Sequence, residues 1–138
     1  MTPVLLDTGV IVALLDRSER YHLACKESLD TLAAPLVTCE AVIAESCYLL
    51  RHLPGAVDAV LKNVEAGAFQ IPFRLSGAAP QLRRIFRRYS DREVDLADAC
   101  LVYLAGEMGT GDILTLDRDF EVYRWGSNRR FRLLIRLR

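Results

Sequence analysis

The sequence lacks the features that mark membrane proteins, secreted proteins and serine hydrolases. No apolar run approaches the roughly 20 residues that a membrane-spanning helix needs. The chain reaches a short apolar segment and then Asp7 directly, without the regions of a signal peptide. It contains neither a G-x-S-x-G nucleophile elbow nor a P-loop. We therefore expect a cytoplasmic protein with no membrane partner. We expect neither a hydrolase with a serine nucleophile elbow nor a P-loop protein.

Nitrogen and sulfur ligands for a metal are also scarce. The four cysteines form no C-x-x-C pair, and His22 and His52 are the only histidines. A Cys/His zinc site is therefore not expected. Disulfides are not expected in a cytoplasmic chain. Cys47 and Cys100 lie in apolar, helical contexts, where cysteine packs as a small hydrophobic residue.

Lysine is nearly absent, although the chain is not poor in positive charge. Arginine supplies sixteen of the eighteen basic residues, and the net charge is zero. Residues 1–69 carry five basic and nine acidic side chains, whereas residues 70–138 carry thirteen basic and nine acidic ones. The planar guanidinium suits phosphate better than a point charge does. This bias favours phosphate contact mildly and is equally compatible with surface ion pairs.

Strand-like and helix-like segments alternate along most of the 138 residues, which predicts one domain spanning residues 1–138. Short apolar runs bounded by turn residues predict strands at 4–6, 36–38, 69–71, 113–116, 122–125 and 131–137. Apolar residues at helical spacing predict helices at 10–15, 21–32, 40–52, 56–66, 82–89 and 95–105. This order is typical of an α/β sandwich with a mainly parallel sheet.

One stretch, residues 95–120, gathers carboxylates at the ends of two elements. A helix begins at Asp95, which is placed to cap it, and carries Asp98 in its first turn. Glycines stop this helix, and the apolar strand that follows runs directly into Asp117 and Asp119. Open α/β sheets bind ligands where parallel strands end. These four carboxylates are therefore candidate site residues.

Asp7 follows the first predicted strand and has two interpretations. Its side chain, or that of Thr8, could cap the helix that comes next. Alternatively, Asp7 is a carboxylate at the C-terminal end of a central strand, the usual ligand position in such sheets. The sequence leaves both open.

Glu45 is the most informative acidic residue of the first half. Its neighbours three and four positions away are Ala41, Val42, Tyr48 and Leu49, all apolar. A carboxylate buried on such a stripe is costly unless it is paired or bound to a cation. The alternative is that Glu45 lies at the rim of the stripe and reaches solvent. We favour a functional role.

The predicted helix at 82–89 has an apolar face and an arginine-rich one. Arg83, Arg84, Arg87 and Arg88 lie opposite the apolar side chains. A face of this kind is usually only solvated, which is the favoured interpretation. The functional alternative is a basic wall beside a nucleic-acid groove.

Asp7, Glu45, Asp98 and Asp117 come from four different predicted elements. If they converge, mutual repulsion raises their pKa values unless a cation neutralises them. Carboxylates with little histidine or cysteine suit the hard cations Mg²⁺ and Mn²⁺. Such ions polarise a phosphodiester and lower the pKa of bound water, so hydrolysis needs no covalent nucleophile.

With these residues in place, the chain resembles the PIN domain and, within it, the VapC-type toxins of toxin–antitoxin pairs. The resemblance covers essentially the whole chain and is carried by Leu5-Leu6-Asp7-Thr8-Gly9, Thr38 followed by Glu45, Asp95-Leu96-Ala97-Asp98-Ala99, and Thr115-Leu116-Asp117-Arg118-Asp119-Phe120. It implies a three-layer α/β/α sandwich whose mainly parallel central sheet has an acidic pocket at the strands' C-terminal edge. The absence of lysine near that pocket leaves phosphate contact to arginine and the backbone.

The resemblance further implies a divalent-metal-dependent endoribonuclease that hydrolyses RNA phosphodiester bonds. Its Mg²⁺ or Mn²⁺ would be held by Asp7, Glu45, Asp98 and Asp117. Asp95 and Asp119 are two further candidates, each of which could instead cap a turn or contact a ligand residue. Members of the family typically form homodimers and are held inactive by a small antitoxin that covers the pocket.

Three rival interpretations remain to be weighed. A receiver-type phosphoacceptor domain needs a lysine late in the chain, but the lysines are Lys26 and Lys62. A phosphatase of the haloacid-dehalogenase type needs an acid where the chain has Gly9. The third rival is a PIN-like module that binds RNA or a protein without nuclease turnover. Since all four family acids are present, the nuclease is the leading hypothesis.

Overall fold

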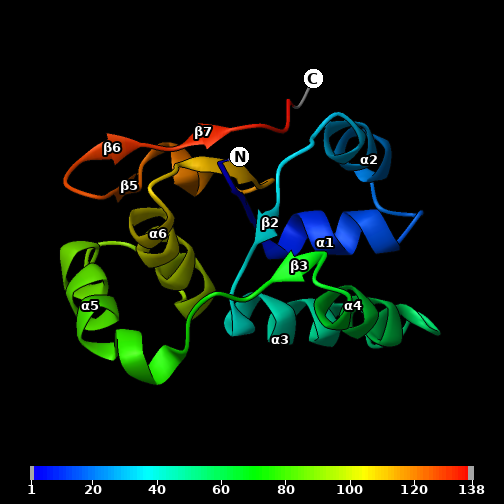
Figure 1. Cartoon of the computed structure of the whole chain (residues 1–138), viewed down its shortest axis with the longest axis horizontal. Coiled ribbons are helices and arrows are strands. Elements are labelled where there is room, and N and C mark those ends of the chain that lie inside the picture. The colour runs from blue at the N-terminus through cyan, green and yellow to red at the C-terminus, as the bar shows by residue number, and fades with distance from the viewer. Residues whose placement is uncertain (1, 137–138) are drawn as a thin grey trace.

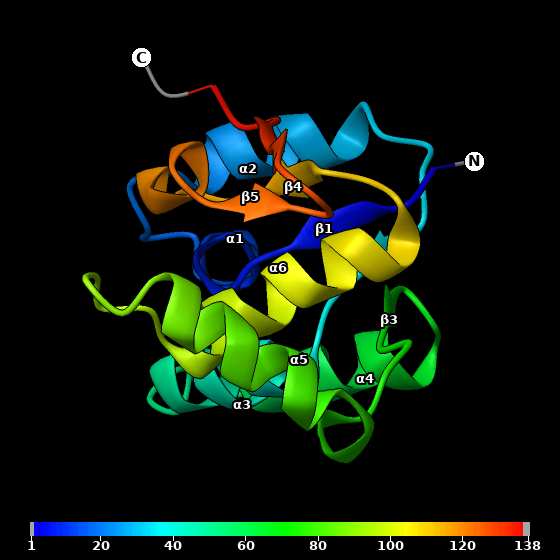
Figure 2. The same ribbon diagram turned by 90° about the vertical axis from the view of Figure 1, so that its left-hand side faces the viewer.

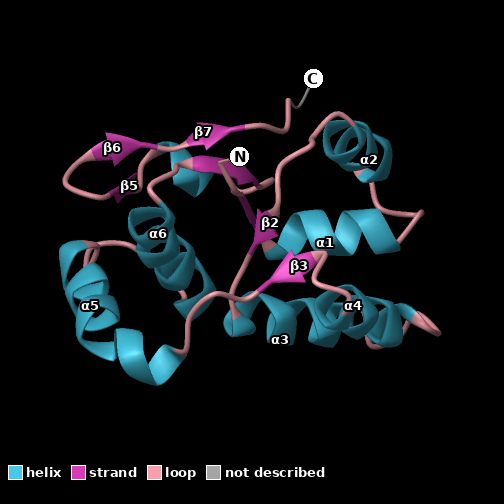
Figure 3. Ribbon diagram, viewed as in Figure 1, coloured by secondary structure: helices cyan, strands magenta, loops and turns pink. Residues whose placement is uncertain are grey.

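The computed structural model describes residues 2–136 and contains a five-stranded parallel sheet (Figures 1 and 3). The strands lie in the order β3 (Phe69–Gln70), β2 (Leu36–Val37), β1 (Val4–Leu6), β4 (Asp112–Leu114) and β7 (Arg132–Leu133). β1 is central, with Leu5 opposite Val37 on one side and Ile113 on the other. All four pairings are parallel. The predicted mainly parallel sheet is confirmed.

Helices cover both faces of this sheet and make it a three-layer sandwich. They are α1 (Thr8–Leu15), α2 (His22–Asp30), α3 (Glu40–Leu49), α4 (Ala56–Glu65), α5 (Leu75–Arg88) and α6 (Leu96–Met108). Figure 2 shows α2 on one side of β1 and β4, with α5 and α6 on the other. No helix within residues 2–136 combines the length and apolar character that crossing a bilayer requires.

The core is built around β1, β4 and α6. Leu5, Leu6, Ile113 and Leu114 are fully buried. The first three turns of α6 are buried almost all round, so its sequence is apolar on every side instead of amphipathic. Because this helix is enclosed, the carboxylate in its first turn is held in the interior at the end of the sheet.

The C-terminal part departs most from the predicted strands. The strand expected at 122–125 is only β5 (Arg124–Trp125), which pairs antiparallel with β6 (Arg129–Arg130) outside the main sheet. The tight turn between them uses Gly126 at φ +59°. The strand expected at 131–137 is reduced to β7, and its expected end, residue 137, lies outside the described residues. Such short pairings depend on contacts with distant residues, which local sequence patterns do not report.

Two helices begin earlier than predicted. α1 begins at Thr8, two residues early, because Asp7 caps it. α5 begins at Leu75 and includes Pro80, whereas the apolar spacing predicted only 82–89. Pro80 is the sixth helical residue, and because proline has no backbone N–H to donate, local sequence argues against a helix that continues through it.

Candidate active site

Five carboxylates line one hollow of about 330 Å³ at the C-terminal edge of the sheet. Asp7 follows β1, Glu45 lies on α3, Asp98 lies in the first turn of α6, and Asp117 follows β4. These four are separated by 38, 53 and 19 residues along the chain. Since β1 and β4 are neighbouring parallel strands, their ends bring Asp7 and Asp117 together. Asp95, the cap of α6, is the fifth.

Asp7 caps α1 and also lines the hollow at the end of β1, where binding of a ligand stays a prediction. Its Oδ1 accepts a hydrogen bond from the Thr8 backbone N–H at 2.8 Å, and its Oδ2 accepts one from Thr115 Oγ1 at 2.6 Å. Only 7% of the residue is exposed. The pKa of Asp7 is raised to about 6, mainly by burial. The two hydrogen bonds lower this pKa, whereas the charges of Asp117 and Glu45 raise it further.

Thr115 joins the two strand ends. Its hydroxyl donates to Asp7 and accepts from the backbone N–H of Asp117 at 3.0 Å. Asp117 in turn caps the 3₁₀ helix η1 (Arg118–Glu121), with Oδ1 accepting from the Asp119 N–H at 2.9 Å. The strand expected to reach residue 116 ends at Leu114, and side-chain hydrogen bonds then direct the chain into the site. Sequence reasoning gave Thr115 no role of its own; its signal was a lone hydroxyl between apolar residues.

Asp98 has the most strongly raised pKa among the carboxylates of this hollow. Its backbone N–H donates to Asp95 Oδ1 at 2.8 Å, and its Oδ2 accepts from the Tyr123 hydroxyl at 3.2 Å. The pKa of Asp98 is raised to about 8, mainly by burial and further by repulsion from Asp95, Asp7 and Asp117. The hydrogen bond from Tyr123 lowers the pKa and so offsets part of this rise. Tyr123 was missed at the sequence level, where it was only an apolar residue of a predicted strand.

The burial argument for Glu45 is wrong, although the residue lines the hollow. Glu45 is exposed, and its apolar neighbours Tyr48 and Leu49 are 62% and 52% exposed. α3 instead buries Val42 and Ser46, so the helix is rotated relative to the expected stripe. Glu45 makes no hydrogen bond or ion pair within residues 2–136. Its carboxylate is therefore free to reach toward a ligand.

The two further candidates separate in the structure. Asp95 caps α6 and also lines the acidic hollow. Asp119 does not line it; its Oδ1 lies 3.6 Å from Nη2 of Arg92, with which it forms an ion pair. Geometry thus leaves Asp95 as the stronger additional candidate.

The donor set of the hollow fits a hard divalent cation. Every charged group in its lining is a carboxylate, and Mg²⁺ and Mn²⁺ prefer such oxygen ligands. The hydroxyl of Thr8, in the same lining, is buried without a hydrogen-bond partner. In the part of the chain that the structure describes, no three acidic, histidine or cysteine side chains already surround one point. Binding an ion therefore requires side chains to adjust, with exposed Glu45 the freest to move.

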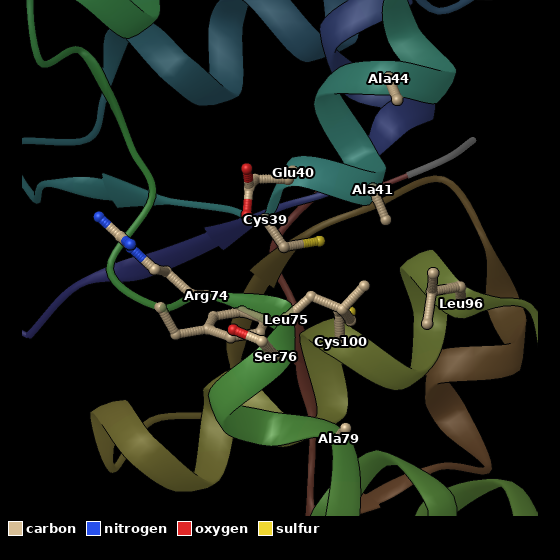
Figure 4. A pocket seen from close by; sticks show the side chains of 11 residues that line it. Cys39, Glu40, Ala41, Ala44, Arg74, Leu75, Ser76, Ala79, Leu96 and Cys100 are labelled. Carbon is tan, nitrogen blue, oxygen red and sulfur yellow. The ribbon is translucent and has the colours of Figure 1, made fainter.

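A larger hollow of about 930 Å³ lies between α3, α5 and α6 and has a different character (Figure 4). It is mostly apolar, with Glu40 and Arg74 among its lining residues. Cys39 and Cys100 both line it, and a hydrogen bond with Cys100, together with burial, raises the pKa of the Cys39 thiol. All four cysteines are free. This larger hollow therefore lacks the cluster of carboxylates that lines the acidic one.

Residues 4–126 match the sequence profile of the PIN domain. The chain belongs to the PIN-domain family. It is 36% identical over 117 residues to ribonuclease VapC26 of Mycobacterium tuberculosis (strain ATCC 25618 / H37Rv), covering 83% of this chain and 87% of that protein. Its fold matches the crystal structure of VapC20 from Mycobacterium tuberculosis, a toxin that cleaves the sarcin–ricin loop, with a TM-score of 0.80. That match covers 91% of this chain and 98% of VapC20 at 20% identity. At this identity it supports the shared fold and nothing more.

We expect the two hydrogen bonds of the Thr115 hydroxyl to stabilise this PIN domain. A Thr115→Val variant leaves a buried oxygen of Asp7 and the N–H of Asp117 without their partner. We expect the free energy of unfolding to fall by about 1–3 kcal/mol. Urea unfolding measures this, with Thr115→Ser, which keeps the hydroxyl, as the control. A Thr115→Val protein that is as stable as wild type would contradict this prediction.

Proposed function

We propose that this PIN-domain protein is a divalent-metal-dependent endoribonuclease and the toxin of a VapBC-type toxin–antitoxin pair. The observation that carries the proposal is the convergence of Asp7, Glu45, Asp98 and Asp117 in one hollow at the ends of parallel strands. The similarity to ribonuclease VapC26 supports the reaction type. In the proposed reaction, water cleaves an RNA phosphodiester bond.

In this proposal the four carboxylates hold the metal, and Asp95 is a further candidate ligand. Mg²⁺ or Mn²⁺ bound there would polarise the phosphodiester and lower the pKa of a bound water. The chain's own contribution is to fix the ligands. Thr115 orients Asp7 toward Asp117, and the Tyr123 hydroxyl fixes one oxygen of Asp98. Glu45, which has no such partner, completes the set from α3.

The proposal is tested by incubating purified protein with total RNA in Mg²⁺, in Mn²⁺ and in a chelator, and mapping the new ends. We expect cleavage with at least one ion and none with the chelator. Binding without cleavage under every condition would favour the rival interpretation, a PIN-like module that binds RNA or a protein without turnover.

The exposed apolar residues beside the acidic hollow suggest a protein partner. Leu49 lines the hollow, and Tyr48 next to it is still more exposed. Exposed apolar surface at a functional site is typical of an interaction surface. In our proposal a small cognate antitoxin covers this surface in the cytoplasm and keeps RNA away from the carboxylates.

We also expect the protein to be a homodimer that co-purifies with the antitoxin when the two are expressed together. Multi-angle light scattering of the free protein and of the complex measures both properties. A free protein that is monomeric at micromolar concentration would contradict the homodimer.

A further inference from the structure

Three arginines surround a third hollow of about 370 Å³ between α5, α6 and β5. Arg84 and Arg88 come from α5, and Arg124 comes from β5. Figures 1 and 2 show these three elements together on one side of the molecule. Glu107 is the one acidic residue in the lining, and its carboxylate raises the pKa of the nearby Tyr103 hydroxyl. The hollow therefore carries a positive charge overall.

None of these arginines is paired with a carboxylate within residues 2–136. The four ion pairs there use Lys62, Arg92, Arg118 and Arg132. Arg88 donates only to Asn128 Oδ1 at 3.3 Å, and Nη1 of Arg124 donates to three backbone carbonyls. Arg84 makes no hydrogen bond in the described chain. Unpaired guanidinium groups around one hollow are suited to binding a phosphate group.

A further polar atom in the lining lacks a partner. Oε1 of Gln81 is buried and accepts no hydrogen bond. A buried amide oxygen without a donor is uncommon, because it gives up hydration without replacement. A ligand that carries hydroxyl or amino donors as well as a phosphate would satisfy Gln81 and the arginines together once the Gln81 side chain turns its buried Oε1 toward the hollow. A ribonucleotide has these groups.

The arginine hollow lies next to the acidic one. Asp98, Val102 and Gly106 are four residues apart on α6, so they share one helix face, about 6 Å apart along the axis. Asp98 belongs to the acidic hollow, and the other two line the arginine hollow. Tyr123, bound to Asp98, packs edge-on against Tyr89, whose hydroxyl accepts from the backbone N–H of Arg124 at 2.8 Å. An RNA strand of a few nucleotides can span both hollows.

We propose that the hollow around Arg84, Arg88 and Arg124 binds a backbone phosphate of the RNA strand beside the bond that is cut. This inference rests on the proposed ribonuclease function and specifies where its substrate is held. The acidic hollow repels a polyanion and has no lysine nearby to offset that repulsion. The three arginines supply the attraction that the acidic hollow lacks.

α5 provides its own matched control. Arg83 and Arg87 are also exposed and four residues apart, but they do not line the hollow. Arg84→Gln/Arg88→Gln and Arg83→Gln/Arg87→Gln therefore remove equal charge from the same helix. General attraction between RNA and a basic helix would be weakened equally by the two variants, whereas a defined subsite would be weakened by only one.

The experiment measures binding of single-stranded RNA as a function of salt, in a chelator so that metal-dependent cleavage is suppressed. We expect Arg84→Gln/Arg88→Gln to weaken binding about tenfold or more at low salt. It should also reduce the slope of log K against log salt by roughly 0.7 for each lost phosphate contact. The Arg83→Gln/Arg87→Gln variant should retain most of the affinity and slope. Melting temperatures verify folding, and the single variant Arg84→Gln, which removes no hydrogen bond, serves if the double variant unfolds.

Equal losses in the two double variants, or no loss in either, would overturn the inference. These outcomes differ from failure of the proposed function. If wild-type protein cleaves RNA and the Arg84/Arg88 variant binds normally, the nuclease stands and the subsite is wrong. If no preparation cleaves RNA but the Arg84/Arg88 variant alone loses binding, the subsite stands and the nuclease proposal fails.

Discussion

In metal-free buffer the protein is expected to become less stable as the pH rises from about 5 to about 8. The pKa values of Asp7 and Asp98 are raised from 3.8 to about 6 and about 8 in the folded protein. Between the unfolded and folded values, the folded state retains protons that the unfolded state has released. The free energy of unfolding therefore falls across this window. The stabilising contribution is complete below pH 3.8 and is lost above pH 8.

A divalent ion should reverse this loss at pH 8. Because the ion binds the cluster of the folded state, it stabilises that state by mass action, by about 2.7 kcal/mol when its concentration is a hundred times its dissociation constant. Melting temperatures at pH 5 and pH 8, with a chelator or with Mg²⁺ or Mn²⁺, measure both effects.

Asp98→Asn is the control for this measurement, since asparagine does not titrate. The variant should show a shallower pH dependence and a smaller shift with the ion. A wild-type shift that persists unchanged in Asp98→Asn would place the ion elsewhere.

The same substitution should lower the rate of metal-dependent RNA cleavage by about a hundredfold or more. Even residues that only support metal ligands commonly cost ten- to a hundredfold when they are changed. The fold should survive, because asparagine still accepts the Tyr123 hydrogen bond and adds no bulk. Without the ion, the variant should be at least as stable as wild type at pH 8, because it lacks the negative charge of Asp98 that the neighbouring carboxylates repel.

Single-turnover cleavage and the melting temperature, measured on the same preparations, check this prediction. Asp119→Asn is a matched control, because Asp119 lies outside the hollow and is paired with Arg92. We expect it to cleave at close to the wild-type rate. A folded Asp98→Asn protein that cleaves at the wild-type rate would remove that residue from the proposed site.

The features that local patterns encode were predictable from the sequence. β1 and β4 are short apolar runs followed directly by Asp7 and, after Thr115-Leu116, by Asp117. Because parallel strands end at one edge of a sheet, a parallel α/β order brings these carboxylates together. Asp95 could be predicted as the cap of α6 for the same local reason, and its side chain accepts from the N–H of Asp98.

The features that depend on distant contacts were not predictable in this way. The exposure of Glu45 follows from how α3 is rotated when Val42 and Ser46 are buried, which residue spacing within α3 does not specify. Tyr123 reaches Asp98 across 25 residues, and Thr115 reaches Asp7 across 108. The division of the arginines on α5 into pairs inside and outside a hollow likewise depends on where α6 and β5 lie.

The central claim is that carboxylates at the end of the sheet direct water to an RNA phosphodiester, and the chemistry of the cleaved ends tests it most directly. The measurement is cleavage of a defined RNA by wild-type protein with Mg²⁺ or Mn²⁺ in ¹⁸O-labelled water, with mass analysis of the product ends. Attack by water predicts one ¹⁸O atom in the terminal phosphate of one product and a free hydroxyl on the other. Fragments that end in a 2′,3′-cyclic phosphate without ¹⁸O would show attack by the RNA's own 2′-hydroxyl and would contradict the claim.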